Sequence, residues 1–277
     1  MKALSIIAAV GIGLLTATQP VNMTLALVAG VILIMLSLIT PIASLAMLLI
    51  FAPMRTLIAT EASIQLPIDI GQISFILLIG FWGVQRISQH KPLIGFKRSA
   101  LYAPLIGYVF ILAISAFEAV SITAWITEWL KWVLILILVV LVLNFRQHWE
   151  WIVFTLIAAG AGAAIIGLYT FFGGSGADHL LINGRFFRAF GTFGQPNPLG
   201  GFMGLLAPIS LMMMFGYGWM MLRHRYLNYV PHVAFYGVAS LLITATLFAS
   251  WSRGAWLGFG VSMMVIAFAL PRRAWQS

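Results

Sequence analysis

Two arginines, Arg188 and Arg253, are the side chains of this sequence best suited to binding an anion. Arg253 follows Ser252 and lies between two stretches without formal charge, residues 233–252 and 254–270. A guanidinium at the centre of a bilayer costs about 2.5–3.5 kcal/mol on insertion scales, so one beside two apolar stretches needs a compensating partner. A carboxylate or a phosphate compensates best, because its oxygens match the planar fork of donors.

Arg188 lies in the longest stretch that is not apolar, residues 173–198, which is rich in glycine and ends in QPNP. A loop of about 25 residues among short loops is a candidate functional segment. Arg185 is three residues before Arg188 and shares its face if this part is helical. Asn197 beside proline predicts a helix N-terminus with Asn197 as its cap, and the partial positive charge there favours an anion. Gln195 precedes it as a further candidate contact.

The remaining polar side chains have a structural interpretation beside the functional one. The arginines could instead reach lipid headgroups or pair with Asp178 or Glu128. His179, beside Asp178, could act as a general base, but adjacent side chains rarely point together. Glu118 could have a catalytic role or bind an acceptor. Glu128 and Lys131 have the i,i+3 spacing of a structural ion pair on a helix.

The composition predicts a polytopic membrane protein. Of 277 residues, 62% are hydrophobic and 8% charged, whereas soluble domains carry roughly 25% charge. The chain has no cysteine, which excludes disulfides, iron–sulfur clusters and thiolate metal sites. The net charge of +9 does not indicate nucleic-acid binding, because the basic residues fall in short loops between apolar stretches. Motifs of ATPases, soluble hydrolases and metal sites are absent from the sequence.

A membrane-spanning helix needs roughly 20 apolar residues. The sequence contains ten such stretches and therefore predicts an all-α fold of about ten transmembrane helices. The first three are punctuated by prolines, and two of those three could form a re-entrant pair. The expected spans are 3–19, 22–39, 42–59, 70–87, 100–118, 126–145, 150–172, 197–219, 231–251 and 254–271.

The basic residues predict that both termini lie in the cytoplasm. With the N-terminus inside, ten of the fifteen Lys and Arg residues fall on the inner side, and five of the six acidic residues fall outside. The outer basic residues are the minority that need a reason, namely Arg55, Lys131, Arg185, Arg188 and Arg253.

By composition the chain divides into three parts. N-terminal transmembrane helices occupy residues 1–172, and a loop occupies 173–198. Residues 197–277 form the start of a core that contains Arg253. The apolar run after Lys2 resembles a signal peptide, but the residues that follow lack a small-x-small cleavage site. The sequence therefore predicts an uncleaved first helix.

Two segments together resemble the O-antigen ligase and polymerase family of bacterial envelope glycosyltransferases. Residues 188–201 (RAFGTFGQPNPLGG) look like the family's Arg-x-x-Gly-Thr-Phe-Gly-Asn-Pro-Asn stretch, with Gln195 where Asn is commoner. Residues 252–258 (SRGAWLG) are close to its Ser-Arg-Gly-x-x-Leu/Ile-Gly signature. The glutamine form is also similar to protein O-oligosaccharyltransferases, so the acceptor stays open.

The resemblance implies a C-type (GT-C) membrane glycosyltransferase of lipopolysaccharide or polysaccharide biosynthesis, in the bacterial inner membrane with its site facing the periplasm. The implied donor is a glycan on undecaprenyl pyrophosphate, the acceptor a lipid A-core, a glycan or a protein, and no metal or other cofactor is used. Arg188 and Arg253 would hold the pyrophosphate. The weaker substrate-binding candidates are Arg185, Gln195, Asn197, Ser252 and Glu118.

The sequence departs from the family pattern after the second segment. In the family a histidine in a large outer loop, beyond the next span, is the expected base. Here no histidine follows His232, and the sequence ends at Ser277. We therefore expect an incomplete ligase-like chain with an unassigned general base. Two rival hypotheses stay open: an inactive fragment, and a carrier of lipid-linked sugars, which predicts charges at mid-membrane depth and internal repeats.

Overall fold

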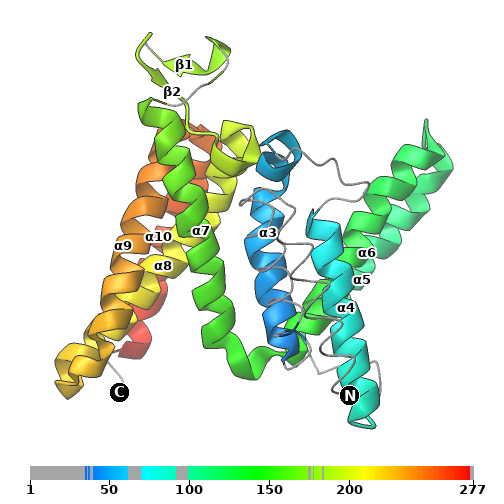
Figure 1. Ribbon diagram of the computed structural model, residues 1–277, viewed down its shortest axis with the longest axis horizontal. Helices are drawn as coiled ribbons and strands as arrows, with labels where there is room; N and C mark the ends of the chain where they lie inside the picture. Colours follow the sequence, from blue (N-terminus) through cyan, green and yellow to red (C-terminus); the bar gives the residue numbers. More distant parts are fainter. Residues whose placement is uncertain are drawn as a thin grey trace, which may run out of the picture. The chain divides into compact units, whose positions relative to one another are not determined.

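A computed structural model describes Met35, Ser37 and residues 40–61, 70–91, 99–173, 176, 178–182 and 184–274. Apart from Met35 and Ser37, the expected spans 3–19 and 22–39 lie outside these residues. The described chain is almost entirely helical (Figure 1). Its helices are apolar on every face, as expected for segments surrounded by lipid or by other helices. Between their ends, long helices satisfy their backbone hydrogen bonds internally, which a bilayer requires.

The long helices of the described residues begin and end within a few residues of the expected spans. Four are long and apolar enough to cross a membrane, over 122–144, 146–172, 196–224 and 227–249. The fold is therefore that of a helical membrane protein, whereas the count of ten spans and the orientation stay predictions. The bounds are α3 Pro41–Glu61, α4 Ile70–Ser88, α5 Tyr102–Ile114, α6 Ile122–Asn144, α7 Trp149–Phe172, α8 Pro196–His224, α9 Val230–Ala249 and α10 Arg253–Ala274.

Short elements connect the helices. Strands β1 (Leu181–Ile182) and β2 (Phe186–Phe187) form an antiparallel hairpin beyond the end of α7, with Leu181 opposite Phe187 (Figure 1). This hairpin is the one departure from the all-α expectation in the described part of the chain. The 3₁₀ helices are η1 Ser115–Glu118, η2 Arg146–His148, η3 Asp178–Leu180, η4 Gly191–Phe193 and η5 Leu227–Tyr229.

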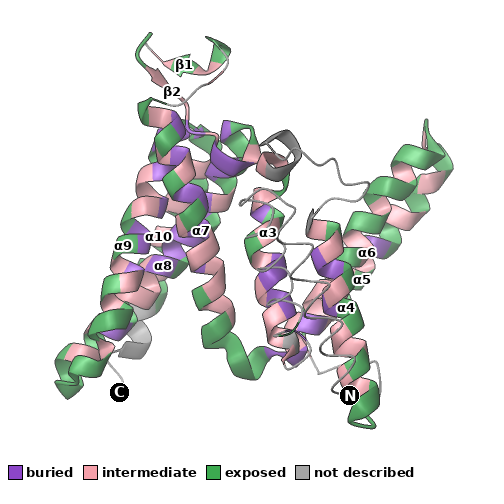
Figure 2. Ribbon diagram, viewed as in Figure 1, coloured by how far each residue is buried: buried purple, intermediate pink, exposed green. Residues whose placement is uncertain are grey.

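The chain forms two compact units, residues 82–151 and the remainder. In the larger unit, α7 packs against α8 and α9, and buried residues lie on all three of these helices (Figure 2). Glycines of α7 permit this approach, because a Cβ on Gly160 would lie 2.3 Å from Leu206 Cδ1 and one on Gly167 would lie 2.7 Å from Thr246 Cγ2. The Thr246 hydroxyl also donates to the Ala164 carbonyl at 3.0 Å. Small residues and interhelical hydrogen bonds are the usual means of packing helices in lipid.

Glycines at the start of α8 bring this helix against the beginning of α10. A Cβ on Gly200 would lie 2.7 Å from Ser252 Cβ, and one on Gly204 would lie 3.7 Å from Ala255 Cβ. The small-x-x-x-small spacing of Gly200 and Gly204 therefore marks a real helix contact. The same spacing in Gly254 and Gly258 does not, since neither would meet a described atom within 4 Å.

A cysteine pair tests this contact. In the cysteine-free chain, we expect Gly204→Cys with Ala255→Cys to form a disulfide under mild oxidation, because 3.7 Å is close to the usual disulfide Cβ–Cβ separation of about 3.8 Å. Gly204→Cys with Gly258→Cys is the matched control and should stay reduced. A gel-mobility shift on membranes reads the result, and equal cross-linking of both pairs would contradict the described packing.

The smaller unit is built on α5 and α6 and contains the end of α4. Its clearest polar link is a hydrogen bond of 2.7 Å from Arg86 Nη2 to the buried Asn144 Oδ1 at the end of α6. The Arg86 guanidinium also lies over the Trp82 ring, 5.2 Å from its centroid. The hydrogen bond joins the last turn of α4 to the last turn of α6, whereas the Trp82 contact lies within α4.

Candidate arginine site

The two segments that carry Arg188 and Arg253 meet at the C-terminal end of α9. A helix end leaves its last carbonyl groups without an intrahelical donor. Here Leu247 accepts from the Ser250 hydroxyl and the Trp256 indole, and Phe248 accepts from the Trp251 N–H. The Ala249 carbonyl accepts from the Ala189 N–H at 2.9 Å. The end of α9 is thus completed by residues of both segments.

Arg188 supplies the last of these donors. Its Nε donates to the Ser250 carbonyl at 3.0 Å, and its Nη2 donates to the Trp251 carbonyl at 3.2 Å and to Asn197 Oδ1 at 2.9 Å. A cation at a helix C-terminus also stabilises the helix dipole. Three of the five N–H groups of the guanidinium are therefore used, and the two on Nη1 donate to no described residue. Arg188 is therefore part of the protein framework, and its Nη1 edge has no partner among the described residues.

Arg253 is placed differently. It is the first residue of α10, its side chain is exposed, and its guanidinium makes no hydrogen bond or ion pair with the described residues. The Ser252 carbonyl accepts the first helical hydrogen bond, from the Trp256 N–H at 3.0 Å. In the first turn, the N–H groups of Arg253, Gly254 and Ala255 lack intrahelical acceptors. This end of α10 therefore combines a free guanidinium with free backbone donors.

The start of α8 differs from the prediction. The helix begins at Pro196 with Gln195 as its N-cap, and the exposed Gln195 side chain makes no capping hydrogen bond. Asn197 is the second helical residue and not the cap, and its amide oxygen accepts from Arg188. Pro196 and Pro198 have no N–H to offer. The first turn of α8 is consequently a weaker anion site than the first turn of α10.

The condition under which Arg185 would share a helical face with Arg188 is not met, because this segment is a hairpin. Arg185 lies in the turn between the strands, is exposed, and stacks over the Phe186 ring at 5.7 Å from its centroid. Arg188 follows β2, and its N–H donates to the Leu180 carbonyl at 2.8 Å. A three-residue separation places two side chains on one face of a helix but on opposite faces of an extended chain.

The segment after Arg188 is buried against α7. Gly191 has a φ of 47°, and a Cβ there would lie 3.2 Å from the Ala163 carbonyl oxygen and from Gly167 backbone atoms. Thr192 is fully buried, and its hydroxyl has no hydrogen-bond partner in the described structure. The Gly-Thr-Phe part of the first segment therefore fixes where Arg188 stands relative to α7.

The other candidates play different parts. Ser252 is 8% exposed and packs against Gly200, so it supports the turn and does not face a ligand. Asp178 and His179 are exposed in η3 and make no hydrogen bond with the described residues. Glu118 is exposed at the end of η1, in the smaller unit. The structure thus brings together Arg188, Asn197 and the 250–253 turn, and not the remaining candidates.

The predicted ion pair between Glu128 and Lys131 is confirmed, and both side chains are more than half exposed. No described carboxylate of the larger unit pairs with Arg188 or Arg253, so the alternative pairing with Asp178 is not seen. Within the described ranges, no three His, Asp or Glu side chains form a group that could hold a metal ion.

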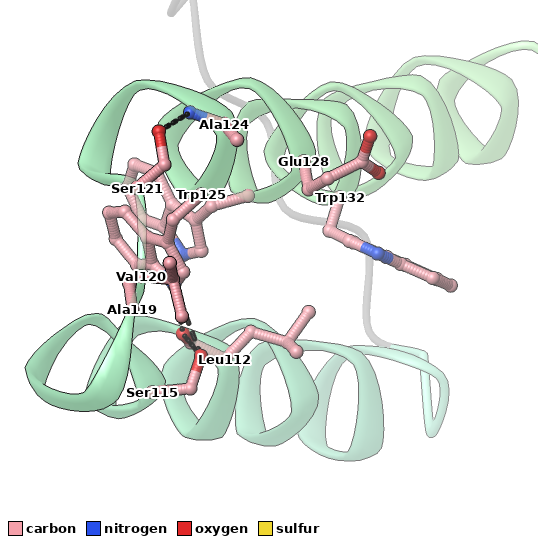
Figure 3. A pocket seen from close by; sticks show the side chains of 10 residues that line it. Leu112, Ser115, Ala119, Val120, Ser121, Ala124, Trp125, Glu128 and Trp132 are labelled. Carbon is pink, nitrogen blue, oxygen red and sulfur yellow. Dashed lines mark hydrogen bonds between the residues drawn. The ribbon is translucent and has the colours of Figure 1, made fainter.

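A pocket of about 510 Å³ lies between α5 and α6 in the smaller unit (Figure 3). Its walls are mostly apolar, and the Trp125 and Trp129 rings stack there with centroids 5.7 Å apart. Their indole N–H groups are satisfied by the carbonyls of Leu112 and Val109, each at 3.1 Å. The pocket suits an apolar group, and it contains no arginine.

Two residues central to the arginine site were not predicted from the sequence, Ser250 and Trp251. They contribute through their backbone carbonyls, and a residue's type does not indicate that its carbonyl will accept a hydrogen bond from a distant side chain. The one available signal was their position between the apolar stretch of α9 and Arg253.

No family model, no curated protein and no solved structure matches this chain.

Proposed function

We propose that this chain forms the donor-binding part of an O-antigen ligase-like membrane glycosyltransferase, which transfers a glycan from undecaprenyl pyrophosphate to an acceptor at the periplasmic face of the bacterial inner membrane. One observation carries the proposal. Arg188, from the first segment, hydrogen-bonds to the carbonyls of Ser250 and Trp251, immediately before Arg253 of the second. The two arginines that the resemblance assigns to one pyrophosphate therefore come to one end of the helix bundle.

The chemistry follows from where negative charge develops. As the bond between the anomeric carbon of the glycan and the pyrophosphate oxygen breaks, the electron pair goes to the pyrophosphate. The Nη1 edge of Arg188, the guanidinium of Arg253 and the first N–H groups of α10 are donors suited to that charge. Arginine stays protonated at every relevant pH, so this stabilisation needs no proton transfer from the arginines themselves. The acceptor of the hydroxyl proton stays unassigned.

Polymerases and protein O-oligosaccharyltransferases use the same donor chemistry, so the proposal covers the donor side and leaves the acceptor as lipid A-core, glycan or protein. A carrier of lipid-linked sugars would need no positioned leaving-group site. Because a carrier would also have to bind the pyrophosphate, cleavage of the glycan from its donor is the observation that separates transfer from transport.

Binding of undecaprenyl pyrophosphate to the purified chain in nanodiscs tests the proposal. We expect tighter binding than for undecaprenyl monophosphate, and a loss of roughly 10- to 150-fold in Arg253→Ala, because charge-assisted hydrogen bonds contribute about 1.5–3 kcal/mol. Arg253→Lys should recover only part of the loss, since an ammonium lacks the bidentate fork.

Arg223→Ala is the matched control. Arg223 is exposed in the last turn of α8, at the other end of that helix from Arg188, and its loss should leave binding unchanged. Equal affinity for undecaprenyl pyrophosphate and undecaprenyl monophosphate, or full binding by Arg253→Ala, would contradict the proposed donor site. Movement of an intact lipid-linked glycan across vesicles, without cleavage, would favour the carrier instead.

A further inference from the structure

Trp251 has a backbone conformation that is unusual for its residue type. Its φ is 52°, in the left-handed region. Two other non-glycine residues in the described ranges share this feature, His90 and Arg225, and both follow helix ends. A bulky residue with positive φ costs about 1–2 kcal/mol and persists where the surrounding structure over-determines it. Glycine or asparagine is the usual residue at this point after a helix.

The left-handed residue lets α9 end and α10 begin within a very short connection. Ser250 caps α9, and α10 starts at Arg253. The same turn presents two consecutive carbonyls, of Ser250 and Trp251, to the single guanidinium of Arg188. Helical residues direct their carbonyls along the helix axis, so a continuous helix through 251 would not present them to one side chain.

Contacts from several directions hold the turn. The Ser250 hydroxyl donates to the Leu247 carbonyl at 2.7 Å and accepts from the Ser252 N–H at 3.3 Å. On the side of α8, the absence of a side chain at Gly200 makes room, because a Cβ there would lie 2.6 Å from Ser250 Oγ. The Trp251 indole is less restrained. Trp251 is 49% exposed, and its ring centroid lies 6.0 Å from that of Trp256.

From this arrangement we infer that Trp251 is a positioning residue of the arginine site, acting through its left-handed backbone and not through its indole. By turning the 250 and 251 carbonyls to Arg188, it aims the free Nη1 edge of that guanidinium toward the ligand and starts α10 at Arg253. The expected effect of Trp251 on pyrophosphate binding rests on the proposed function. The effect on Arg188 itself is independent of any ligand.

The experiment separates backbone from indole with four variants. Trp251→Gly and Trp251→Asn accept a positive φ without the indole, Trp251→Val opposes it, and Trp251→Phe keeps an aromatic ring with a similar backbone cost. Phenylglyoxal modification, followed by peptide mass spectrometry, measures how fast Arg188 and Arg253 react in the absence of ligand. The affinity of the same full-length proteins for undecaprenyl pyrophosphate in nanodiscs measures the effect on ligand binding.

In the wild type we expect Arg188 to react more slowly than Arg253. Trp251→Gly, Trp251→Asn and Trp251→Phe should keep Arg188 protected and keep the affinity. Trp251→Val should raise the Arg188 rate about tenfold and weaken binding by a similar factor, as expected where a side chain opposes the native backbone conformation. Should the valine variant not fold, Trp251→Thr takes its place, because its branched Cβ also opposes a positive φ, with a change of the same sign.

Two results would overturn the inference. Loss of Arg188 protection in the Gly and Asn variants, with protection kept in Trp251→Phe, would show that the indole acts. Unchanged Arg188 reactivity in Trp251→Val and Trp251→Thr would show that the turn does not hold the guanidinium. A wild-type protein that protects Arg188 yet binds no pyrophosphate would instead sink the proposed function and leave the positioning of Arg188 intact.

Discussion

Arg188→Ala is expected to lose both stability and pyrophosphate binding, whereas Arg253→Ala should lose binding alone. Removing Arg188 leaves the carbonyls of Ser250 and Trp251 without their donor and removes the cation from the end of α9. Hydrogen bonds to a charged group contribute about 1.5–3 kcal/mol each, and the dipole adds up to about 2 kcal/mol. Because Trp251 is partly exposed, we expect a net loss of roughly 3–5 kcal/mol. Arg253 makes no such bond, so its removal costs the fold little.

Thermal unfolding in detergent, followed by intrinsic fluorescence, measures the difference between the two variants. The midpoint should fall by about 10 °C for Arg188→Ala and stay near the wild-type value for Arg253→Ala. Arg188→Lys should keep the dipole contribution but not the forked hydrogen bonds, and so unfold between the two. An Arg188→Ala protein as stable as the wild type would refute the helix-capping role.

Gly191→Ala should destabilise the protein strongly although it adds a single methyl group. Its φ of 47° costs about 1–2 kcal/mol for any residue with a Cβ. That Cβ would also lie 3.2 Å from backbone atoms of Ala163 and Gly167, which belong to α7 and give way less easily than a side chain. Overpacking of this kind typically costs about 1–3 kcal/mol. Together we expect roughly 2–5 kcal/mol, and Gly191→Val should cost more.

Two matched glycine variants separate these contributions. Gly184→Ala meets nothing within 4 Å but has a φ of 66°, so it should show the backbone cost alone. Gly201→Ala lies in α8 and also meets nothing within 4 Å, so it should be neutral or stabilise the helix by up to about 1 kcal/mol. Unfolding midpoints of the three proteins give the comparison. Equal midpoints for Gly191→Ala and Gly201→Ala would contradict the packing of η4 on α7.

The membrane-spanning helices could be predicted from the sequence because their cause is local. A run of about 20 apolar residues has one low-energy solution in a bilayer, a helix that satisfies its own backbone. The expected spans from residue 42 onward therefore match the observed helices closely. The i,i+3 pair of Glu128 and Lys131 was predictable for the same reason, since both partners lie on one turn of one helix.

Helix ends were predicted less well, because several local solutions compete there. Proline is acceptable as the first helical residue at either Pro196 or Pro198, so the sequence permitted Asn197 as cap, and the structure makes Gln195 the cap. Asn197 instead accepts from Arg188, which lies nine residues earlier. The hairpin at 181–187 likewise depends on pairing across a turn, which two-residue strands do not reveal by alternation.

By itself the sequence determined a helical membrane protein and singled out two arginines beside apolar spans. The sequence predicted both on the outer side of the membrane, and only the tertiary structure showed that the segments carrying them meet at the end of α9. Arg188 reaches the carbonyls of Ser250 and Trp251, 62 and 63 residues later in the chain, and Trp251 takes a conformation that its residue type disfavours. The lengths of the apolar stretches and the positions of the charged residues are properties of the sequence, so they can be obtained from it directly. The direction of the carbonyls and the strained backbone at Trp251 arise where separate helices end against one another, and they position the Arg188 guanidinium.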